Sequence, residues 1–250
     1  MFPSVDVGQG DKKGAVVPRA LFPTLFLGDS ADRLELRGLT LLATKVPLRA
    51  GRTIFEEGER ADSAFGVSQG IVRLYKLLPD GRRHIVAFAL PGDFLGVPLA
   101  ERRSCSADAV GEVSLCRFSR VQLEGLIRNS PKLTRLVLDF TARKLDMARD
   151  QQLLLGNGSA EEKVAIFLVD WRKRLERLVP VTHPLPLPMP RQDIADFLGL
   201  KLETVSRTLA KLEQKKVIHL VRKGVFLNGL QDTALVTGRS SQSRAEIRRA

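Results

Sequence analysis

The feature that most restricts the fold of this chain is a pair of short helical patterns on either side of Gly199. The first pattern runs from Gln192 to Leu198, and the second runs from Leu202 to Gln214. In both, apolar side chains recur at steps of three and four residues, so they share one helix face. They are Ile194, Ala195, Leu198, Leu202, Val205, Leu209 and Leu212. Because the alanine permits close helix approach and the glycine suits a sharp turn, the segment predicts a helix-turn-helix.

The face opposite the apolar stripe of the second helix carries side chains that can read the edges of DNA bases. Glu203, Ser206 and Arg207 follow one another at helical spacing, and Ala210 comes one turn later. Arginine can donate two hydrogen bonds to guanine, glutamate can accept one from cytosine, and serine adapts to either. These three polar residues are the predicted base-reading set. The alternative is an ordinary solvated face, on which Glu203 and Arg207 form only a weak surface ion pair.

The residues after this helix favour the interpretation that it binds DNA. Val217–Leu220 and Arg222–Leu227 read as the two strands of a β-hairpin. A hairpin behind a helix-turn-helix makes a winged domain, whose tip can contact phosphates. Arg222 and Lys223 stand at that tip, and Lys201 stands at the start of the second helix. We therefore expect these three basic residues to contact the DNA backbone.

The charge of the chain also suits a nucleic-acid partner. There are 40 basic and 28 acidic residues, which give a formal net charge of +12. Residues 191–250 hold 12 basic and 6 acidic residues, and so carry half of this excess. A basic region of this kind favours a polyanion, either a nucleic acid or an anionic membrane surface. A solvated basic surface has the same composition, so charge alone does not decide between them.

Residues 25–120 follow a different pattern, in which short alternating runs are broken by glycine. Thr53–Phe55, Gly70–Tyr75 and His84–Leu90 are examples, and Asp80-Gly81 between two such runs indicates a hairpin. Several short strands at about ten-residue spacing are typical of a β-sandwich or a barrel. The first half of the chain is therefore predicted to be a β-barrel domain, and the whole fold to belong to the α+β class.

A long helix is predicted between these two regions, because Lys132–Leu155 contains neither glycine nor proline and Pro131 can open a helix. Apolar residues recur along it near the a and d positions of a coiled coil. The predicted dimerisation face consists of Leu133, Leu136, Phe140 and Met147. Leu138 and Leu145 lie on another side, so that one apolar face would pack on the barrel and the other would pair with a second copy. Charged residues interrupt the pattern, and a helix packed wholly within one chain is the alternative.

Gly156–Gly158 ends this long helix and is a predicted hinge. Ser159 and Glu162 have the spacing of a capping box that opens the next helix, and the proline-rich run Pro184–Pro190 predicts extended chain. Five parts are therefore expected. They are a flexible N-terminal extension (1–24), a sensor-type β-barrel domain (25–120), a linker and dimerisation helix (121–157), a winged helix-turn-helix domain (158–230) and a basic tail (231–250).

Several classes of protein do not fit the sequence. No run of eighteen apolar residues exists and the start lacks a signal-peptide core, so we expect a cytoplasmic protein without membrane contact. Two cysteines, Cys105 and Cys116, and three scattered histidines do not have the spacing of a zinc site, and isolated thiols fit a reducing compartment. We find no Gly-rich phosphate loop, zinc-protease motif or nucleophile elbow, so an enzyme is not expected.

The barrel, the long helix and the winged helix-turn-helix together resemble the CRP/FNR superfamily of bacterial transcription regulators. The resemblance covers roughly residues 25–230, and its most specific segment is DIADFLGLKLETVSRTLAKLE. Within that segment, Glu203 followed by Ser206-Arg207 is similar to the base-reading set of the FNR and FixK branches. The resemblance implies a homodimer on double-stranded DNA, at a palindromic site with TTGA-type half-sites. It also implies RNA polymerase as a partner if the protein is an activator.

The resemblance assigns a DNA contact to Arg191, at the start of the first helix of the motif. The residues expected to contact phosphates or bases, beyond the base-reading set, are Arg191, Gln192, Lys201, Thr204, Arg222 and Lys223. Leu202 falls at a family position that faces DNA, where it would touch a thymine methyl group or else belong to the core. We expect it to belong to the core.

The resemblance also suggests effectors. Family members hold a cyclic nucleotide with a glutamate and an Arg-Ser pair; Arg103-Ser104 matches the pair, but Val97 stands in place of the glutamate. An iron–sulfur cluster needs four cysteine ligands, and only Cys116 lies near a ligand position. We therefore expect no cofactor and no metal, with Cys105 or Cys116 as candidates for a redox switch. His84 leaves a haem- or small-ligand-sensing regulator as the alternative, beside a ligand-binding module for protein interaction.

Overall fold

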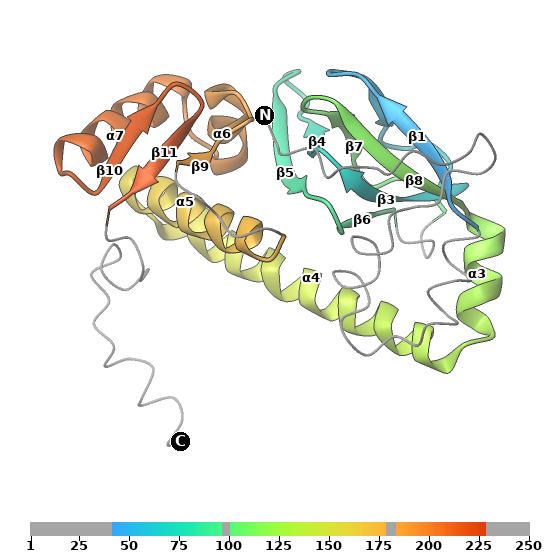
Figure 1. Ribbon diagram of the computed structural model, residues 1–250. Coiled ribbons are helices and arrows are strands. Elements are labelled where there is room, and N and C mark those ends of the chain that lie inside the picture. The colour runs from blue at the N-terminus through green and yellow to red at the C-terminus, as the bar shows by residue number, and fades with distance from the viewer. Residues whose placement is uncertain (1–41, 97–100, 179–183, 229–250) are drawn as a thin grey trace, which may run out of the picture. The chain divides into compact units, whose positions relative to one another are not determined.

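Short strands make up much of the first of the two units into which the chain divides, residues 1–146 and 147–250. The computed structural model describes residues 42–96, 101–178 and 184–228 (Figure 1). The strands described in the first unit are β1 (Thr44–Leu48), β2 (Thr53–Phe55), β3 (Ser63–Gln69), β4 (Val72–Leu77), β5 (Arg83–Ala89), β6 (Phe94–Leu95), β7 (Ser106–Ala109) and β8 (Val113–Ser119).

These strands form two antiparallel sheets whose inner faces meet. One sheet has the strand order β1-β8-β3-β6, and the other has the order β2-β7-β4-β5. Apolar side chains from both sheets fill the space between them, and Val67, Val72, Ala107 and Leu115 at its centre are fully buried. The α+β class is therefore confirmed. Among the described residues the strands form two facing sheets, and a closed barrel is not seen.

The hairpin expected at Asp80-Gly81 joins β4 to β5. Its register runs from Val72 opposite Ala89 to Leu77 opposite Arg83. The Asp80 carboxylate accepts the backbone N–H of Arg82 at 3.0 Å, and this hydrogen bond holds the pKa of Asp80 below its usual value. The turn thus supplies its own hydrogen bonds, which explains why a two-residue signal was enough to place it.

Gly70, which joins β3 to β4, cannot be replaced without strain. Its φ is +82°, and a β-carbon there would overlap the carbonyl oxygen of Glu112. Since this backbone conformation alone costs an L-residue about 1–2 kcal/mol and the overlap adds to it, Gly70→Ala should lower the free energy of unfolding by at least that amount, measured by urea denaturation. Gly111→Ala is the control, because a β-carbon at Gly111 would meet nothing within 4 Å. Equal losses in the two variants would contradict the argument.

After the strands, the described part of the first unit contains α3 (Arg120–Arg128) and the start of α4 (Pro131–Asn157). One face of α4 packs against the outer side of the β1-β8-β3-β6 sheet and against α3. This face contains the buried Leu133 and the partly buried Leu136 and Phe140. They pack with a cluster of buried residues that includes Ala64, Phe94, Cys116, Phe118 and Leu123. Leu133 therefore belongs to the core of its own chain and cannot also form a dimer face, whereas for the partly buried Leu136 and Phe140 the dimer face stays a prediction.

Other apolar side chains of α4 are exposed to solvent. Leu138 is 62% exposed, Leu145 is 52% exposed and Met147 is 47% exposed. Leu138 and Leu145 are seven residues apart, so they lie on one side of the helix two turns from each other. Of the four residues predicted to form a dimer face, Met147 is exposed, Leu136 and Phe140 are partly buried and Leu133 is buried. The exposed face is instead defined by Leu138 and Leu145.

Beyond the end of α4, the described part of the second unit contains the helices α5 (Ala160–Glu176), α6 (Arg191–Leu198) and α7 (Leu202–Gln214). Its strands are β9 (Leu185–Pro186), β10 (Ile218–Val221) and β11 (Gly224–Leu227). The predicted capping box is present, since the Ser159 hydroxyl accepts the N–H of Glu162 and the Glu162 carboxylate accepts the N–H of Ser159. The preceding helix α4 continues through Gly156 to Asn157, so the chain leaves the helix later than the glycine suggested.

Candidate nucleic-acid interface

Helix α7 is half buried along its length, and this burial decides which side chains face solvent. Val205, Thr208, Leu209 and Leu212 are buried against the rest of the unit. On the other side Glu203 and Arg207 are exposed, and Ser206 is half-buried between them. Since a packed apolar face holds the helix in place, the three polar side chains of the predicted base-reading set project from a fixed support.

The first turn of α7 differs from the expectation for Leu202. This side chain is 39% exposed, beside the exposed Lys201 and Glu203 and the half-buried Thr204. The assignment of Leu202 to the core was wrong, because this first residue of the helix is exposed while Val205, three residues later, is buried. The structure therefore adds an apolar side chain to the surface formed by the base-reading set.

Helix α6 provides the support for α7. Its residues Ile194, Ala195 and Leu198 are buried, and Ala195 is inaccessible to solvent. Gly199 ends the helix with φ +62°, a left-handed conformation that glycine adopts without strain. At the other end of α6 both Arg191 and Gln192 are exposed, and the Gln192 amide donates to Asp196 at 2.6 Å.

The predicted wing is an antiparallel pair, β10 and β11, and β9 adds a third strand. Arg222 and Lys223 occupy the turn between the paired strands and are exposed. The wing is attached to the end of α7 through Glu213, whose carboxylate accepts the backbone N–H of Leu220 at 2.8 Å. The same carboxylate lies 3.2 Å from Nδ1 of His219. Sequence reasoning missed Glu213, because no pattern connects a helix end to a strand backbone seven residues later.

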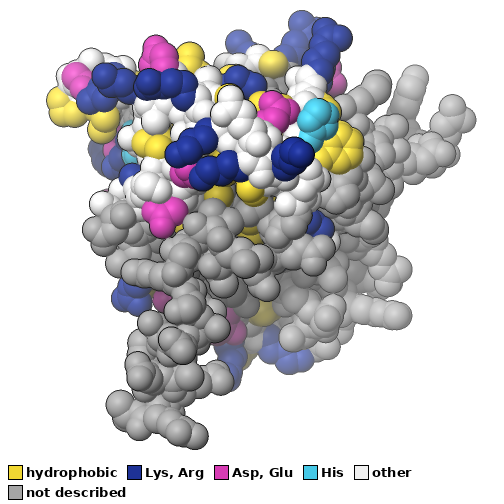
Figure 2. All heavy atoms as spheres, turned by 90° about the vertical axis from the view of Figure 1, so that its left-hand side faces the viewer, with side chains coloured by type: hydrophobic (Ala, Val, Ile, Leu, Met, Phe, Trp, Pro, Cys, Tyr) yellow, Lys and Arg dark blue, Asp and Glu magenta, His cyan; other side chains and the backbone are white. Residues whose placement is uncertain are grey.

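Basic side chains gather on this side of the second unit. Figure 2 shows Lys and Arg side chains spread over the face that carries α7 and the wing, with a few acidic side chains among them. The exposed basic residues of α6, α7 and the wing are Arg191, Lys201, Arg207, Lys211, Lys215, Lys216, Arg222 and Lys223. Such a surface attracts a polyanion before any specific contact forms.

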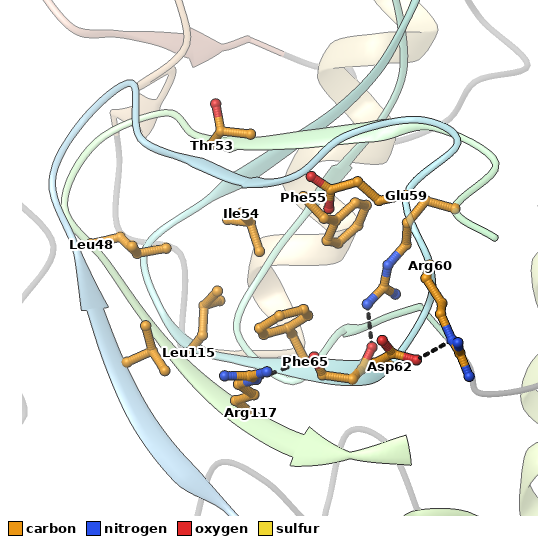
Figure 3. A pocket seen from close by; sticks show the side chains of 13 residues that line it. Leu48, Thr53, Ile54, Phe55, Glu59, Arg60, Asp62, Phe65, Leu115 and Arg117 are labelled. Carbon is orange, nitrogen blue, oxygen red and sulfur yellow. Dashed lines mark hydrogen bonds and ion pairs between the residues drawn. The ribbon is translucent and has the colours of Figure 1, made fainter. Parts of the chain in front are cut away.

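The first unit contains a pocket of about 450 Å³ at the rim of the two sheets. The Phe55 and Phe65 rings lie inside it, and an Arg60–Asp62 ion pair lies at one edge (Figure 3). The remaining lining residues are Val46, Leu48, Thr53, Ile54, Glu59, Ser63, Arg103, Leu115 and Arg117. An apolar interior with charged groups at its edge has the general form of a site for a small ligand.

Arg103 is the most unusual lining residue, because its guanidinium is buried. Only 7% of the residue is exposed, and the guanidinium carbon lies 4.3 Å from the centre of the Phe55 ring. Its Nη2 donates to the backbone carbonyl of Ser63, while Nε and Nη1 have no hydrogen-bond partner. Burial lowers the pKa of this guanidinium. Gly96 makes room for it, since a β-carbon there would overlap Nη1.

Comparison with known proteins identifies the architecture. Residues 45–130 match the family model of the cyclic nucleotide-binding domain, and residues 187–218 match that of bacterial regulatory proteins of the crp family. The transcriptional activatory protein AadR of Rhodopseudomonas palustris is 55% identical over 74% of this chain and 77% of that protein. The chain belongs to the CRP/FNR superfamily. The nitrogen fixation regulation protein FixK of Bradyrhizobium diazoefficiens is 48% identical over 79% of this chain and 84% of that protein.

A solved structure agrees with this assignment. FixK2 from Bradyrhizobium japonicum has a TM-score of 0.73 and 36% identity, covering 80% of this chain and 99% of that one. The chain is thus a FixK-like member of the CRP/FNR superfamily, a DNA-binding transcription regulator rather than an enzyme. In the part of the chain that the structure describes, no helix is long and apolar enough to cross a membrane.

The effector sites known in the CRP/FNR superfamily can be compared with these residues. Of the candidate cyclic-nucleotide residues, Arg103 is buried and Ser104 is exposed, while Val97 lies outside the described residues. Cys116 is buried and Cys105 is half-buried, and burial raises the pKa of both thiols. A raised pKa lowers the thiolate fraction on which reactivity depends, so these environments do not favour a redox switch. The described residues include no group of His, Cys, Asp or Glu that could hold a metal ion.

Proposed function

We propose that this CRP/FNR protein binds palindromic sites with TTGA-type half-sites as a homodimer, without cyclic AMP or an iron–sulfur cluster. The observation that carries the proposal is the accessible set Glu203, Ser206 and Arg207 on a helix whose opposite face is buried. The names of its relatives include transcriptional activators, so RNA polymerase is a further partner if this chain also activates.

Each side chain of the reading surface has a partner in such a half-site. The Arg207 guanidinium would donate to O6 and N7 of the guanine, and the Glu203 carboxylate would accept from the amino group of the paired cytosine. Leu202 would contact a thymine methyl group, and Ser206 would donate to a neighbouring base. The residues placed to contact phosphates, or bases at the edge of the site, are Arg191, Gln192, Lys201, Thr204, Arg222 and Lys223.

The proposed dimer forms along α4, through the face defined by Leu138 and Leu145. Both side chains are more than half exposed and lie one heptad apart, which is the spacing of a coiled-coil seam. Met147 is also accessible, but it comes nine residues after Leu138 and so lies on the opposite side of the helix. In the dimer, two copies of α7 should lie about one turn of DNA apart, roughly 34 Å. This spacing would set the separation of the half-sites, and the two-fold symmetry of a homodimer explains why the site is expected to be a palindrome.

The absence of an effector is proposed from two observations. The Arg103 guanidinium is engaged by its own chain, through the Phe55 ring and the Ser63 carbonyl, whereas a cyclic nucleotide would need it for the phosphate. The sequence contains only two cysteines, and four thiolates are needed for a cluster held by cysteine alone. We therefore expect DNA binding by the purified protein without any added ligand.

The test is a gel shift with a TTGA palindrome and a scrambled duplex at two salt concentrations, together with an absorption spectrum of the same sample. The expected result is binding by a colourless protein, with preference for the palindrome and a steep loss of affinity as salt rises. Equal affinity for the two duplexes would contradict base reading. A chain that binds no DNA would instead be a module for protein interaction, and a Soret band would indicate haem.

A second candidate function is a regulator that senses a small anion in the pocket of the first unit. It is favoured by the two buried nitrogen atoms of Arg103 that lack a partner, since unpaired buried donors are uncommon. Thermal unfolding with and without cyclic AMP tests it. A ligand that binds only the folded protein raises the melting temperature, and Arg103→Gln should abolish the rise. An unchanged melting temperature in the unmodified protein would contradict cyclic AMP as that anion.

A further inference from the structure

One carboxylate of α5 binds two lysines of the reading helix. Glu161, in the first turn of α5, places Oε2 at 2.8 Å from Nζ of Lys211, and its Oε1 accepts from Nζ of Lys215. Each carboxylate oxygen therefore forms an ion pair with one lysine. The two hydrogen bonds hold the pKa of Glu161 below its usual value, so the carboxylate stays ionised at neutral pH. Both lysine side chains are otherwise largely exposed.

These lysines continue the line of Arg207 along α7. Arg207, Lys211 and Lys215 are four residues apart, so they lie on neighbouring turns of one side of the helix. At a rise of about 1.5 Å per residue, the lysine backbones lie roughly 6 Å and 12 Å beyond Arg207. A helix in the major groove has phosphates along both edges of a channel about 12 Å wide. Lysines on four-carbon stems at these positions can reach those phosphates when α7 reads bases.

We infer that Glu161 is a positioning residue that limits the electrostatic part of DNA binding, because it holds Lys211 and Lys215 away from the phosphates. The inference rests on the proposed function, in which α7 enters the major groove. A phosphate contact carries no sequence information, so each lysine kept on Glu161 removes affinity that would apply to any duplex. The base contacts of Glu203 and Arg207 then account for a larger share of the affinity that remains.

The test compares Glu161→Gln with the unmodified protein by measuring DNA affinity as a function of salt. If one or two lysines are released onto phosphates, the plot of log affinity against log salt should steepen by about 0.9 for each. Between 50 and 200 mM salt, this corresponds to an additional loss of affinity of about 3- to 12-fold. At low salt, the variant should bind both the palindrome and a scrambled duplex more tightly than the unmodified protein does.

Two sets of variants make the result specific. Glu176→Gln is the control, because it removes one carboxylate from the same helix. Among the described contacts, Glu176 forms an ion pair with Arg172 and with no lysine of α7, so this variant should leave the salt slope unchanged. Replacing Lys211 and Lys215 by glutamine should change the slope little while Glu161 is present. In the Glu161→Gln background, the same replacement should restore the original slope. If the steeper slope persisted in that triple variant, it would come from loss of repulsion by Glu161, and the inference would be wrong.

The other outcomes are equally decisive. A merely structural role for Glu161 predicts a lower melting temperature with weaker DNA binding, which is opposite in sign to the result expected here. A salt slope equal to that of the unmodified protein also overturns the inference. If the unmodified protein shows no preference for the palindrome, base reading fails but the slopes on either duplex still decide the role of Glu161. A protein that binds no duplex overturns both proposals.

Discussion

Replacing Leu138 and Leu145 of α4 by glutamate is expected to give a monomer whose affinity for the TTGA palindrome is lower by about 100-fold or more. The two exposed side chains supply the apolar face proposed to pair with a second copy, and a carboxylate in such a seam would be buried without a partner. A monomer can engage only one half-site. It therefore loses the gain of about 10²–10⁴ that comes from linking two binding events.

Sedimentation velocity measures the association state, and a gel shift measures the affinity. The matched control is Val121→Glu, because this α3 side chain is 77% exposed but lies outside the proposed seam. It should leave both measurements unchanged. Leu133→Ala should instead destabilise each chain by about 2–5 kcal/mol, because its side chain is buried in the core. A double glutamate variant that remained dimeric would show that the subunits meet elsewhere.

Replacing Arg207 by alanine is expected to cost about 1–3 kcal/mol on the palindrome, a loss of roughly 5- to 150-fold in affinity, and to relax the preference for guanine at one position. The reason is that a bidentate contact to O6 and N7 distinguishes guanine from the other bases. Arg207→Lys should not restore the preference, because lysine lacks the planar pair of donors. Binding constants for the palindrome and for single-base variants of it measure both effects.

Lys223→Ala provides the comparison for Arg207. Its side chain is exposed at the tip of the wing, where a phosphate contact is proposed. Loss of that contact should weaken binding by a similar factor on every duplex and reduce the salt slope by about 1. If Arg207→Ala also weakened binding equally on all sequences, the residue would contact the backbone and would not read a base.

The parts of the fold that could be predicted are those determined by neighbours in the sequence. The capping box of Ser159 and Glu162, the hairpin at Asp80-Gly81 and the left-handed turn at Gly199 all form within a few residues. The same holds for α7, whose apolar period correctly indicated that Glu203 and Arg207 would face solvent. Local hydrogen bonds and helical period explain these successes.

The failures have a different physical origin. Two apolar faces of α4 were visible in the sequence, but the helical period does not say which face meets the core of the same chain. Leu133 does so, whereas Leu138 does not. Leu202 was wrongly assigned to the core because it is the first residue of its helix. The spacing of apolar residues predicts burial less well there, since no preceding helical turn packs beside it. The ion pairs of Glu161 join residues about fifty positions apart, and the burial of Arg103 depends on aromatic rings from two strands.

The attachment of the wing to α7 through Glu213 has a consequence for how a binding site is chosen. Because the carboxylate at the end of the helix accepts a hydrogen bond from the backbone of β10, we expect the wing tip and the helix to approach DNA together. If the wing contacts phosphates and the helix contacts bases as proposed, the protein sets the distance between the two contacts, and the duplex would have to bend or change its groove width to match it. Base steps that deform easily lower the free energy of that adjustment. Flanking sequence should therefore influence affinity at positions that no side chain touches.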